Sequence, residues 1–305
     1  MTRPVKNVAA SVRQRLQNAA RKMNRPFQEV LAYYAMERFL YRLARSPHAG
    51  RFVLKGALMM RAWHAPASRP TKDIDLLGRL ENTVEAVVPV FKAVCGQQVD
   101  PDGLVFHAET VAGSSIREDA DYAGVRVSFL ATLQNARVAM QVDVGFGDVV
   151  TPAATATDYP TLLDFPAPRL KGYSRETAVA EKFEAMVKLG LLNTRMKDFY
   201  DIWLLAQQFD FDGPTLATAV SRTFANRKTP VVPSPFALTS AFAADGNKQA
   251  QWRAFLRKSR LEGGPAELRE VVEALGAFLL PLADAVHGGR AFDRAWQAPG
   301  PWQER

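Results

Sequence analysis

At 305 residues, with 48% hydrophobic and 23% charged residues, the chain has a globular composition and enough length for one large or two smaller domains. No apolar run reaches the roughly 18 residues of a membrane span, and the basic N-terminus lacks a following apolar stretch, so we expect neither membrane association nor secretion. The single cysteine, Cys95, excludes an intramolecular disulfide and the usual cysteine zinc sites, which fits a cytoplasmic protein.

Positive charge is concentrated in the first 51 residues. The net charge is +8, and this segment alone holds eleven cations against Glu29 and Glu37. The asymmetry favours a polyanionic partner, RNA or DNA more readily than membrane, although a solvated helix face gives the same pattern. The cations are Arg3, Lys6, Arg13, Arg15, Arg21, Lys22, Arg25, Arg38, Arg42, Arg45 and Arg51.

The first half of the chain is predicted to mix helices and short strands. Apolar residues at helical spacing predict helices over 6–46, broken at Arg25-Pro26, and over 57–63 and 82–95. Alternating or continuous apolar runs predict strands at 51–54, 73–77, 124–130 and 138–144, the last two joined in a hairpin around Gln134-Asn135. Residues 96–121 read as short strands and loops.

The second half is predicted to be mainly helical. A connector rich in Pro and Thr spans 151–168, and a second Pro-rich stretch lies at 229–235. Helices are expected at 176–192, 197–209, 215–226 and 265–287.

Asp73 and Asp75 are the most informative residues of the chain. They flank Ile74 in an apolar segment, so a buried strand is predicted with both carboxylates on one face. Adjacent carboxylates repel each other and are costly to desolvate, and a divalent cation removes both penalties. Such oxygen ligands suit Mg²⁺, or Mn²⁺, which usually brings a substrate phosphate. Taken alone, the pair is more typical of surface aspartates at a strand end.

Other residues are candidates for the same chemistry. Asp143, on a neighbouring strand, is a candidate third metal ligand, or else an edge residue that contacts solvent. Lys55-Gly56-Ala57 lies where a strand becomes a helix, which suits either phosphate binding or a plain tight turn.

Two later segments carry charge into apolar helices. Lys182 lies beside the apolar face of its helix, where it can reach phosphate oxygens or pair with a neighbouring glutamate. The segment from Arg195 to Trp203 contains Asp198 and Asp201, and it fits either a capped core helix or the polar wall of a nucleotide pocket.

Common catalytic motifs are absent from the sequence. There is no Walker A pattern, dinucleotide-binding loop, Gly-x-Ser-x-Gly or His-Glu-x-x-His. The four histidines, which are scattered, do not lie near a candidate nucleophile in the sequence.

Four ordered blocks together resemble the AbiEii/AbiGii toxin family, nucleotidyltransferase-like proteins of the DNA polymerase β type that include the MenT toxins of mycobacteria. The resemblance covers roughly residues 30–205, and the four blocks in order are more specific than any one of them. The blocks, which follow a similar segment at Phe39-Leu-Tyr-Arg-Leu43, are Arg51-Phe-Val-Leu-Lys-Gly-Ala-Leu58, Arg69-Pro-Thr-Lys-Asp-Ile-Asp-Leu-Leu-Gly78, Ala180-Glu-Lys-Phe183 and Arg195-Met-Lys-Asp-Phe-Tyr-Asp-Ile202.

The resemblance implies an α+β fold, with a mixed sheet, flanking helices and a helical C-terminal domain. We therefore expect basic N-terminal helices packed on the core over 1–50, a nucleotidyltransferase core over 51–172 and a helical domain over 173–305. It also implies a toxin of a toxin–antitoxin or phage-defence system, with a cognate antitoxin as partner. Characterised relatives bind an NTP with Mg²⁺, and some add pyrimidine nucleotides to the 3′ end of tRNA, which stops translation.

By motif, the resemblance implies roles for particular residues. Asp73 and Asp75 match the metal-binding Asp-x-Asp of the family, and Asp143 is the third expected metal ligand from its place on the neighbouring strand. Asp73, Asp75, Lys182 and Asp198 are the expected catalytic residues. Ala57 departs from the family pattern, which often has a second Gly or a Ser there, and this puts the rate or selectivity for triphosphate in doubt. The expected nucleotide-binding residues are Lys55, Gly56, Ala57, Thr71, Lys72, Lys182 and Arg195.

The function expected is therefore transfer of NMP to an RNA acceptor, most simply the 3′ end of tRNA. The N-terminal cations are one candidate RNA surface, and Arg253, Arg257, Lys258 and Arg260 are a second. Three alternatives stay open: NMP transfer to a protein, a nucleotide-binding toxin or regulator without catalysis, and a basic nucleic-acid-binding protein whose carboxylates are structural.

Overall fold

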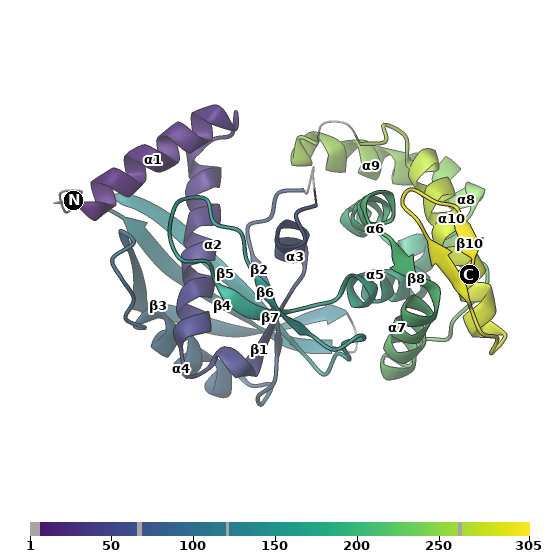
Figure 1. The fold of residues 1–305 in the computed structure, drawn as a ribbon, viewed down its shortest axis with the longest axis horizontal. Coiled ribbons are helices and arrows are strands. Elements are labelled where there is room, and N and C mark those ends of the chain that lie inside the picture. The colour runs from purple at the N-terminus through teal and green to yellow at the C-terminus, as the bar shows by residue number, and fades with distance from the viewer. Residues whose placement is uncertain (1–6, 66–68, 120–121, 262–263) are drawn as a thin grey trace. The chain divides into compact units, whose positions relative to one another are not determined.

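The computed structural model describes residues 7–65, 69–119, 122–261 and 264–305. By contacts the chain divides into two compact units (Figure 1). Unit 1 comprises 1–62, 71–147 and 155–172, and unit 2 comprises 63–70, 148–154 and 173–305. Arg3 and Lys6, two of the N-terminal cations, lie outside the described residues. No helix in the described ranges has the length and hydropathy needed to cross a membrane.

A mixed seven-stranded sheet forms the centre of unit 1. Its strand order is β3-β4-β5-β2-β1-β7-β6, with β2 parallel to β5, β1 parallel to β7 and the other neighbours antiparallel. The mixed sheet with flanking helices confirms the predicted fold class. The strands are β1 (Phe52–Lys55), β2 (Ile74–Gly78), β3 (Leu104–Asp119), β4 (Tyr122–Leu133), β5 (Ala136–Phe146), β6 (Thr155–Asp158) and β7 (Arg169–Gly172).

Helices α2 and α4 cover one face of this sheet, and Figure 1 shows α2 lying across the strands. Phe39 of α2 packs against Phe91 of α4 and against Phe129 of β4, with ring centroids 5.9 and 4.8 Å apart. This aromatic layer fixes which face of each strand is apolar, so the alternate residues project to the opposite face. The unit 1 helices are α1 (Val8–Lys22), α2 (Phe27–Arg45), α3 (Ala57–Ala62) and α4 (Val84–Cys95).

The sequence prediction was wrong in two parts of unit 1. Residues 96–121 do not form several short strands: most of them belong to the single 16-residue strand β3. The central part of β3 is polar, so its residues have low strand propensity. Pairing with β4 satisfies its backbone hydrogen-bonding groups, with a register shift between His107 and Ala112. The connector predicted over 151–168 contains strand β6, which pairs with the equally unpredicted β7.

Unit 2 is mainly helical, as predicted, and also contains a small antiparallel sheet of order β10-β9-β8 that the prediction lacked. Its strands have only two or three residues each, too short to leave a periodic signal. The elements are α5 (Arg175–Leu189), α6 (Met196–Gln208), β8 (Phe211–Asp212), α7 (Gly213–Asn226), α8 (Ser240–Ala244), α9 (Gly246–Ser259), α10 (Leu268–His287), β9 (Arg294–Trp296) and β10 (Trp302–Glu304).

Candidate active site

Four charged residues form a row across four neighbouring strands of unit 1. Lys55 on β1 is opposite Asp75 on β2 in the strand register, and Asp75 is opposite Asp143 on β5. Asp143 is in turn opposite Arg126 on β4. Directly opposed residues project to the same face of a sheet, which here is the face away from the Phe39 layer. The row therefore reads cation, carboxylate, carboxylate, cation.

Asp73 joins the two central carboxylates from the segment just before β2. One carboxylate oxygen from each of Asp73, Asp75 and Asp143 lies within 4.8 Å of the other two. Asp73 accepts a hydrogen bond from the Thr71 hydroxyl, and the Thr71 N–H donates to the Tyr33 hydroxyl oxygen over 3.0 Å. The approach to β2 is thus anchored on α2, which orients the Asp73 carboxylate.

Gly56 sits at the turn between β1 and α3, with φ of +70°. A Cβ at this position would overlap Oδ2 of Asp75 and would lie 2.6 Å from its Cγ. Only glycine meets both demands, because it adopts positive φ without strain and leaves room for the carboxylate. Ala57 follows as the first residue of α3 and is buried.

The ends of the row neutralise its centre. Arg126 donates from Nε to Oδ1 and from Nη2 to Oδ2 of Asp143, both over 2.8 Å, and Gln141 is 3.3 Å from Oδ2. Lys55 is only 9% exposed. A metal is therefore not the only possible source of positive charge beside the paired carboxylates, because Lys55 and Arg126 lie in the same row.

A second charged cluster lies within unit 2. Lys182 of α5 places Nζ 2.8 Å from Asp198 Oδ1 and 2.9 Å from Asp201 Oδ2. Arg195 Nε is 2.7 Å from Asp198 Oδ2, and Arg69 donates to both oxygens of Asp201. Three cations thus surround two buried carboxylates, and the cluster has a net charge of +1.

The titration behaviour of this cluster follows from those contacts. Burial by itself raises the pKa of Asp198, but the Lys182 ammonium and the Arg195 guanidinium outweigh it and hold that pKa at about 2. The pKa of Asp201 is also lowered, because Arg69 and Lys182 outweigh the burial of its carboxyl. Burial opposes the charge on Lys182, but the two aspartates raise its pKa above the usual value. All three groups are therefore ionised at neutral pH.

The predicted site residues thus fall into two groups. Unit 1 holds Lys55, Gly56, Ala57, Thr71, Lys72, Asp73, Asp75 and Asp143, and unit 2 holds Lys182, Arg195 and Asp198. Lys72 differs from its neighbours in being exposed.

The sequence reasoning missed four residues of these clusters. Arg126 was within reach, because the predicted two-residue turn at Gln134-Asn135 puts it opposite Asp143. Asp201 was noted in the Arg195–Trp203 segment, but its ion pairs with Lys182 and Arg69 were not predicted. The contacts of Tyr33 and Arg69 link segments far apart in the chain and leave no local signal.

The N-terminal cations are less available than the sequence suggested. Arg38 and Arg42 are buried, where they pair with Glu37 and Asp102. Three others are held by Asn135, Asp164 and Glu29, namely Arg13, Arg15 and Arg25. The remaining described cations, Arg21, Lys22, Arg45 and Arg51, are exposed.

The cations of α9 and its C-cap are placed differently. Arg253, Arg257, Lys258 and Arg260 are all exposed. Within the ranges that the structure describes, none of the four has an acidic partner. Unit 2 therefore presents a compact basic surface along α9.

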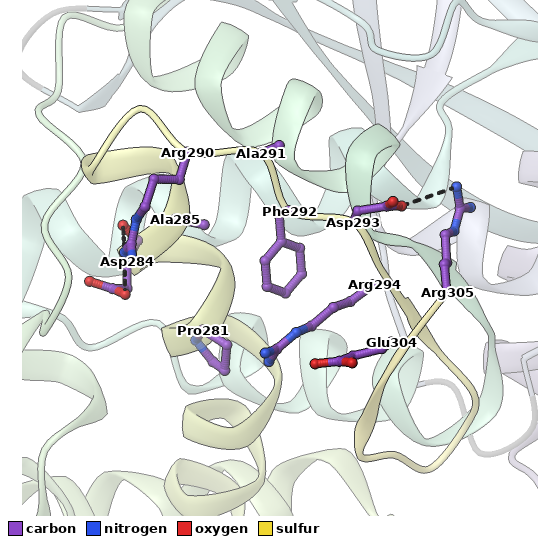
Figure 2. A pocket seen from close by; sticks show the side chains of 10 residues that line it. All are labelled: Pro281, Asp284, Ala285, Arg290, Ala291, Phe292, Asp293, Arg294, Glu304 and Arg305. Atoms are coloured by element: carbon purple, nitrogen blue, oxygen red, sulfur yellow. Dashed lines mark hydrogen bonds and ion pairs between the residues drawn. The ribbon is translucent and has the colours of Figure 1, made fainter.

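A pocket in unit 2, of about 430 Å³, is lined by residues near the C-terminus (Figure 2). It contains three arginines and three acidic residues, and two of the arginines already bind acids: Arg290 pairs with Asp284, and Arg305 lies 3.8 Å from Asp293. Its charge is balanced, and no predicted site residue lines it, so it does not compete as the reaction centre. Nor does Cys95 offer a nucleophile, because burial raises the pKa of its thiol to about 12.

A carboxylate cluster on a mixed sheet is the arrangement expected of an enzyme that transfers nucleotidyl groups. The profile of the family described as "Nucleotidyl transferase AbiEii toxin, Type IV TA system" matches residues 38–285. The chain therefore belongs to the AbiEii family of nucleotidyl transferase toxins, as the resemblance predicted.

Two solved structures are similar at low identity. JHP933 from Helicobacter pylori is 14% identical, with a TM-score of 0.46, over 86% of this chain and 93% of that one. An H. pylori protein described as a candidate nucleotidyltransferase is 15% identical, with a TM-score of 0.47, over 86% and 96%. No curated protein matches the sequence. The family assignment comes from the profile.

Proposed function

We propose that this nucleotidyl transferase uses a divalent cation, Mg²⁺ or Mn²⁺, to transfer NMP from an NTP to an RNA acceptor, most simply the 3′ end of tRNA. In this reaction the acceptor hydroxyl gives up its proton to solvent and its oxygen attacks the α-phosphorus, while the bond between that phosphorus and the oxygen bridging to the β-phosphate breaks and releases pyrophosphate. The observation that carries the proposal is the meeting of Asp73, Asp75 and Asp143 within 4.8 Å, on the face of the sheet away from its aromatic core.

The residues present fit a divalent cation. Three carboxylates supply the hard oxygen donors that Mg²⁺ prefers, and Gly56 leaves open the space beside Asp75 that any other side chain would fill. Asp73, Asp75 and Asp143 would hold the metal, and bound there it would neutralise charge on the triphosphate. Thr71 fixes the orientation of Asp73, so one ligand is pre-organised.

Binding of the triphosphate requires cationic side chains and backbone N–H groups in addition to the metal ligands. We assign Lys55 to this role, because it is opposite Asp75 in the strand register and directly precedes Gly56. Thr71, Lys72 and the backbone of Gly56-Ala57 complete the assignment in unit 1. The resemblance adds Lys182 and Asp198, Arg195 pairs with Asp198, and the net positive charge of their cluster suits an anionic ligand.

The exposed cations of α9 support an RNA acceptor more strongly than those of α1 and α2 do. RNA binding draws its affinity from phosphate contacts, which need cations that are exposed and not already paired. Arg253, Arg257, Lys258 and Arg260 meet that condition, whereas most described N-terminal cations are buried or engaged.

As a toxin, the enzyme would act in the cytoplasm, where tRNA and NTP are present, and would inhibit translation. A cognate antitoxin, as the family's TA system implies, would relieve that inhibition. Induced expression in a bacterial host should stop growth and protein synthesis, and Asp73→Asn should abolish both effects.

The deciding experiment incubates the purified chain with Mg²⁺, total RNA and each labelled NTP in turn. We expect label on RNA, with Asp73→Asn reduced at least about 100-fold, because a metal contributes several kcal/mol to such a transition state. Asp158→Asn is the matched control, since it removes the same charge from an exposed position on β6 of the same sheet.

Each outcome has a distinct meaning. Label on a polypeptide would replace RNA by a protein acceptor. Full activity of Asp73→Asn would overturn the metal assignment. A folded wild-type enzyme that labels neither RNA nor protein would refute the proposed transfer.

A further inference from the structure

Arg126 and Asp143 form a bidentate ion pair in the unit 1 cluster. Two parallel hydrogen bonds of 2.8 Å join the guanidinium to both carboxylate oxygens, and Gln141 approaches the same carboxylate. The Arg126 side chain is 41% exposed, whereas that of Asp143 is 8% exposed. One partner can therefore leave for solvent, and the other cannot.

This geometry conflicts with a simple metal-ligand role for Asp143. A bidentate arginine occupies the favoured directions of both carboxylate oxygens. The guanidinium also keeps its positive charge at every pH of interest, so it repels a divalent cation that approaches the same carboxylate.

The other two carboxylates are engaged differently. Asp73 is oriented by the neutral hydroxyl of Thr71, and Asp75 is opposite Lys55 in the strand register. Asp143 is instead held by the bidentate guanidinium of Arg126. The three ligands are thus not equivalent.

We infer that Arg126 is a positioning residue that sets the divalent-cation affinity of the cluster by competing for Asp143. Without a cation, Arg126 holds the Asp143 carboxylate in place through two hydrogen bonds. When a cation binds, the guanidinium gives up or shares its hydrogen bonds and moves toward solvent. The inference rests on the proposed function and adds a built-in control of metal loading to it.

Binding of Mn²⁺ alone tests the competition without any nucleotide or activity. Titration of the full chain, followed by the electron paramagnetic resonance signal of free Mn²⁺, gives the dissociation constant. We expect Arg126→Gln to tighten binding about tenfold, because it removes one repelling charge a few ångströms from the cation. Most of that gain should disappear when Asp143→Asn is also present.

A matched control separates this local effect from a change in net charge. Arg169 on β7 pairs across the strands with Asp158, and both are well exposed, so Arg169→Gln changes charge and strand contacts outside the cluster. Its Mn²⁺ affinity should stay within about twofold of the wild type.

Unchanged or weaker Mn²⁺ binding by folded Arg126→Gln would overturn the inference while leaving the metal-dependent function intact. Absence of Mn²⁺ binding by the wild type would instead overturn the metal-dependent function itself. Should Arg126→Gln fail to fold, Arg126→Lys decides the matter: it keeps the charge but loses the bidentate geometry, and binding about threefold tighter is expected. Wild-type affinity in Arg126→Lys would then count against competition.

Discussion

The backbone of Gly56 and the carboxylate of Asp75 lie so close that no side chain fits between them. Strand pairing brings them together, because Lys55 is opposite Asp75 and Gly56 is the next residue along the chain. A motif that reads from the sequence as a phosphate loop therefore has a second physical reason to contain glycine.

Gly56→Ala should displace Asp75 and abolish nucleotide transfer. The positive φ alone costs about 1 to 2 kcal/mol, and the overlap with the carboxylate adds to it, so we expect at least about 2 kcal/mol of destabilisation in urea unfolding. Gly147→Ala separates the cost of the positive φ from the cost of the overlap, because φ there is +79° but a Cβ would meet no atom within 4 Å. Equal losses in the two variants would show that the Asp75 contact contributes nothing.

Asp198→Asn should lower the stability of unit 2 and should make that stability less dependent on pH in the acid range. The folded-state pKa of Asp198, about 2, lies below the usual value, so its contribution to stability is complete above about pH 4 and is lost as pH falls toward 2. At neutral pH that contribution is roughly 2 kcal/mol. Chemical unfolding at pH 2 to 7 measures this contribution. If the variant loses as much stability between pH 4 and pH 2 as the wild type does, Asp198 is not its source.

Glu37 should have the opposite dependence on pH. Burial raises its pKa to about 7, so the folded state binds the proton more tightly than the unfolded chain does. Stability from this group is therefore full below about pH 4.5 and declines as pH rises to 7. Glu37→Gln should remove that decline, whereas Glu29→Gln, on the same helix but partly exposed, should keep it. The pH profiles of urea midpoints compare them.

Reversal of charge on α9 should weaken RNA binding. We expect Arg257→Glu with Lys258→Glu to lower tRNA affinity at least about tenfold and to flatten its salt dependence, because two phosphate contacts are lost. The matched pair on α1, Arg21→Glu with Lys22→Glu, changes charge equally and should have a smaller effect. Filter binding at several salt concentrations gives the tRNA affinity and its salt dependence. A larger loss of affinity in the α1 variant would indicate that RNA binds at α1 instead.

Local pattern explains why much of the fold was predictable. The break at Arg25-Pro26, the β2 strand and the hairpin at Gln134-Asn135 all depend on residues near one another, and the structure confirms each of them. The long strand β3 was missed because its pairing with β4, rather than its own composition, makes it extended.

In the charged clusters, too, local features could be predicted from the sequence and non-local contacts could not. The spacing of Asp73 and Asp75 predicted both on one strand, but β2 begins at Ile74, so Asp73 lies in the segment just before it. The approach of Asp143 to the pair follows from the pairing of β2 with β5, which is not local. The buried pairing of Arg38 and Arg42 had no signature in sequence, since their charges looked like those of exposed neighbours.

The two units are interleaved along the polypeptide, since residues 63–70 and 148–154 leave unit 1 to join unit 2 before the chain finally does so at residue 173. A cut after residue 172 leaves unit 1 with all of its segments, but it separates residues 63–70 and 148–154 from the rest of unit 2. Truncation there would keep Asp73, Asp75 and Asp143 in one fragment but would separate Arg69 from Asp201, so the lysine–aspartate cluster needs segments from both sides of that point.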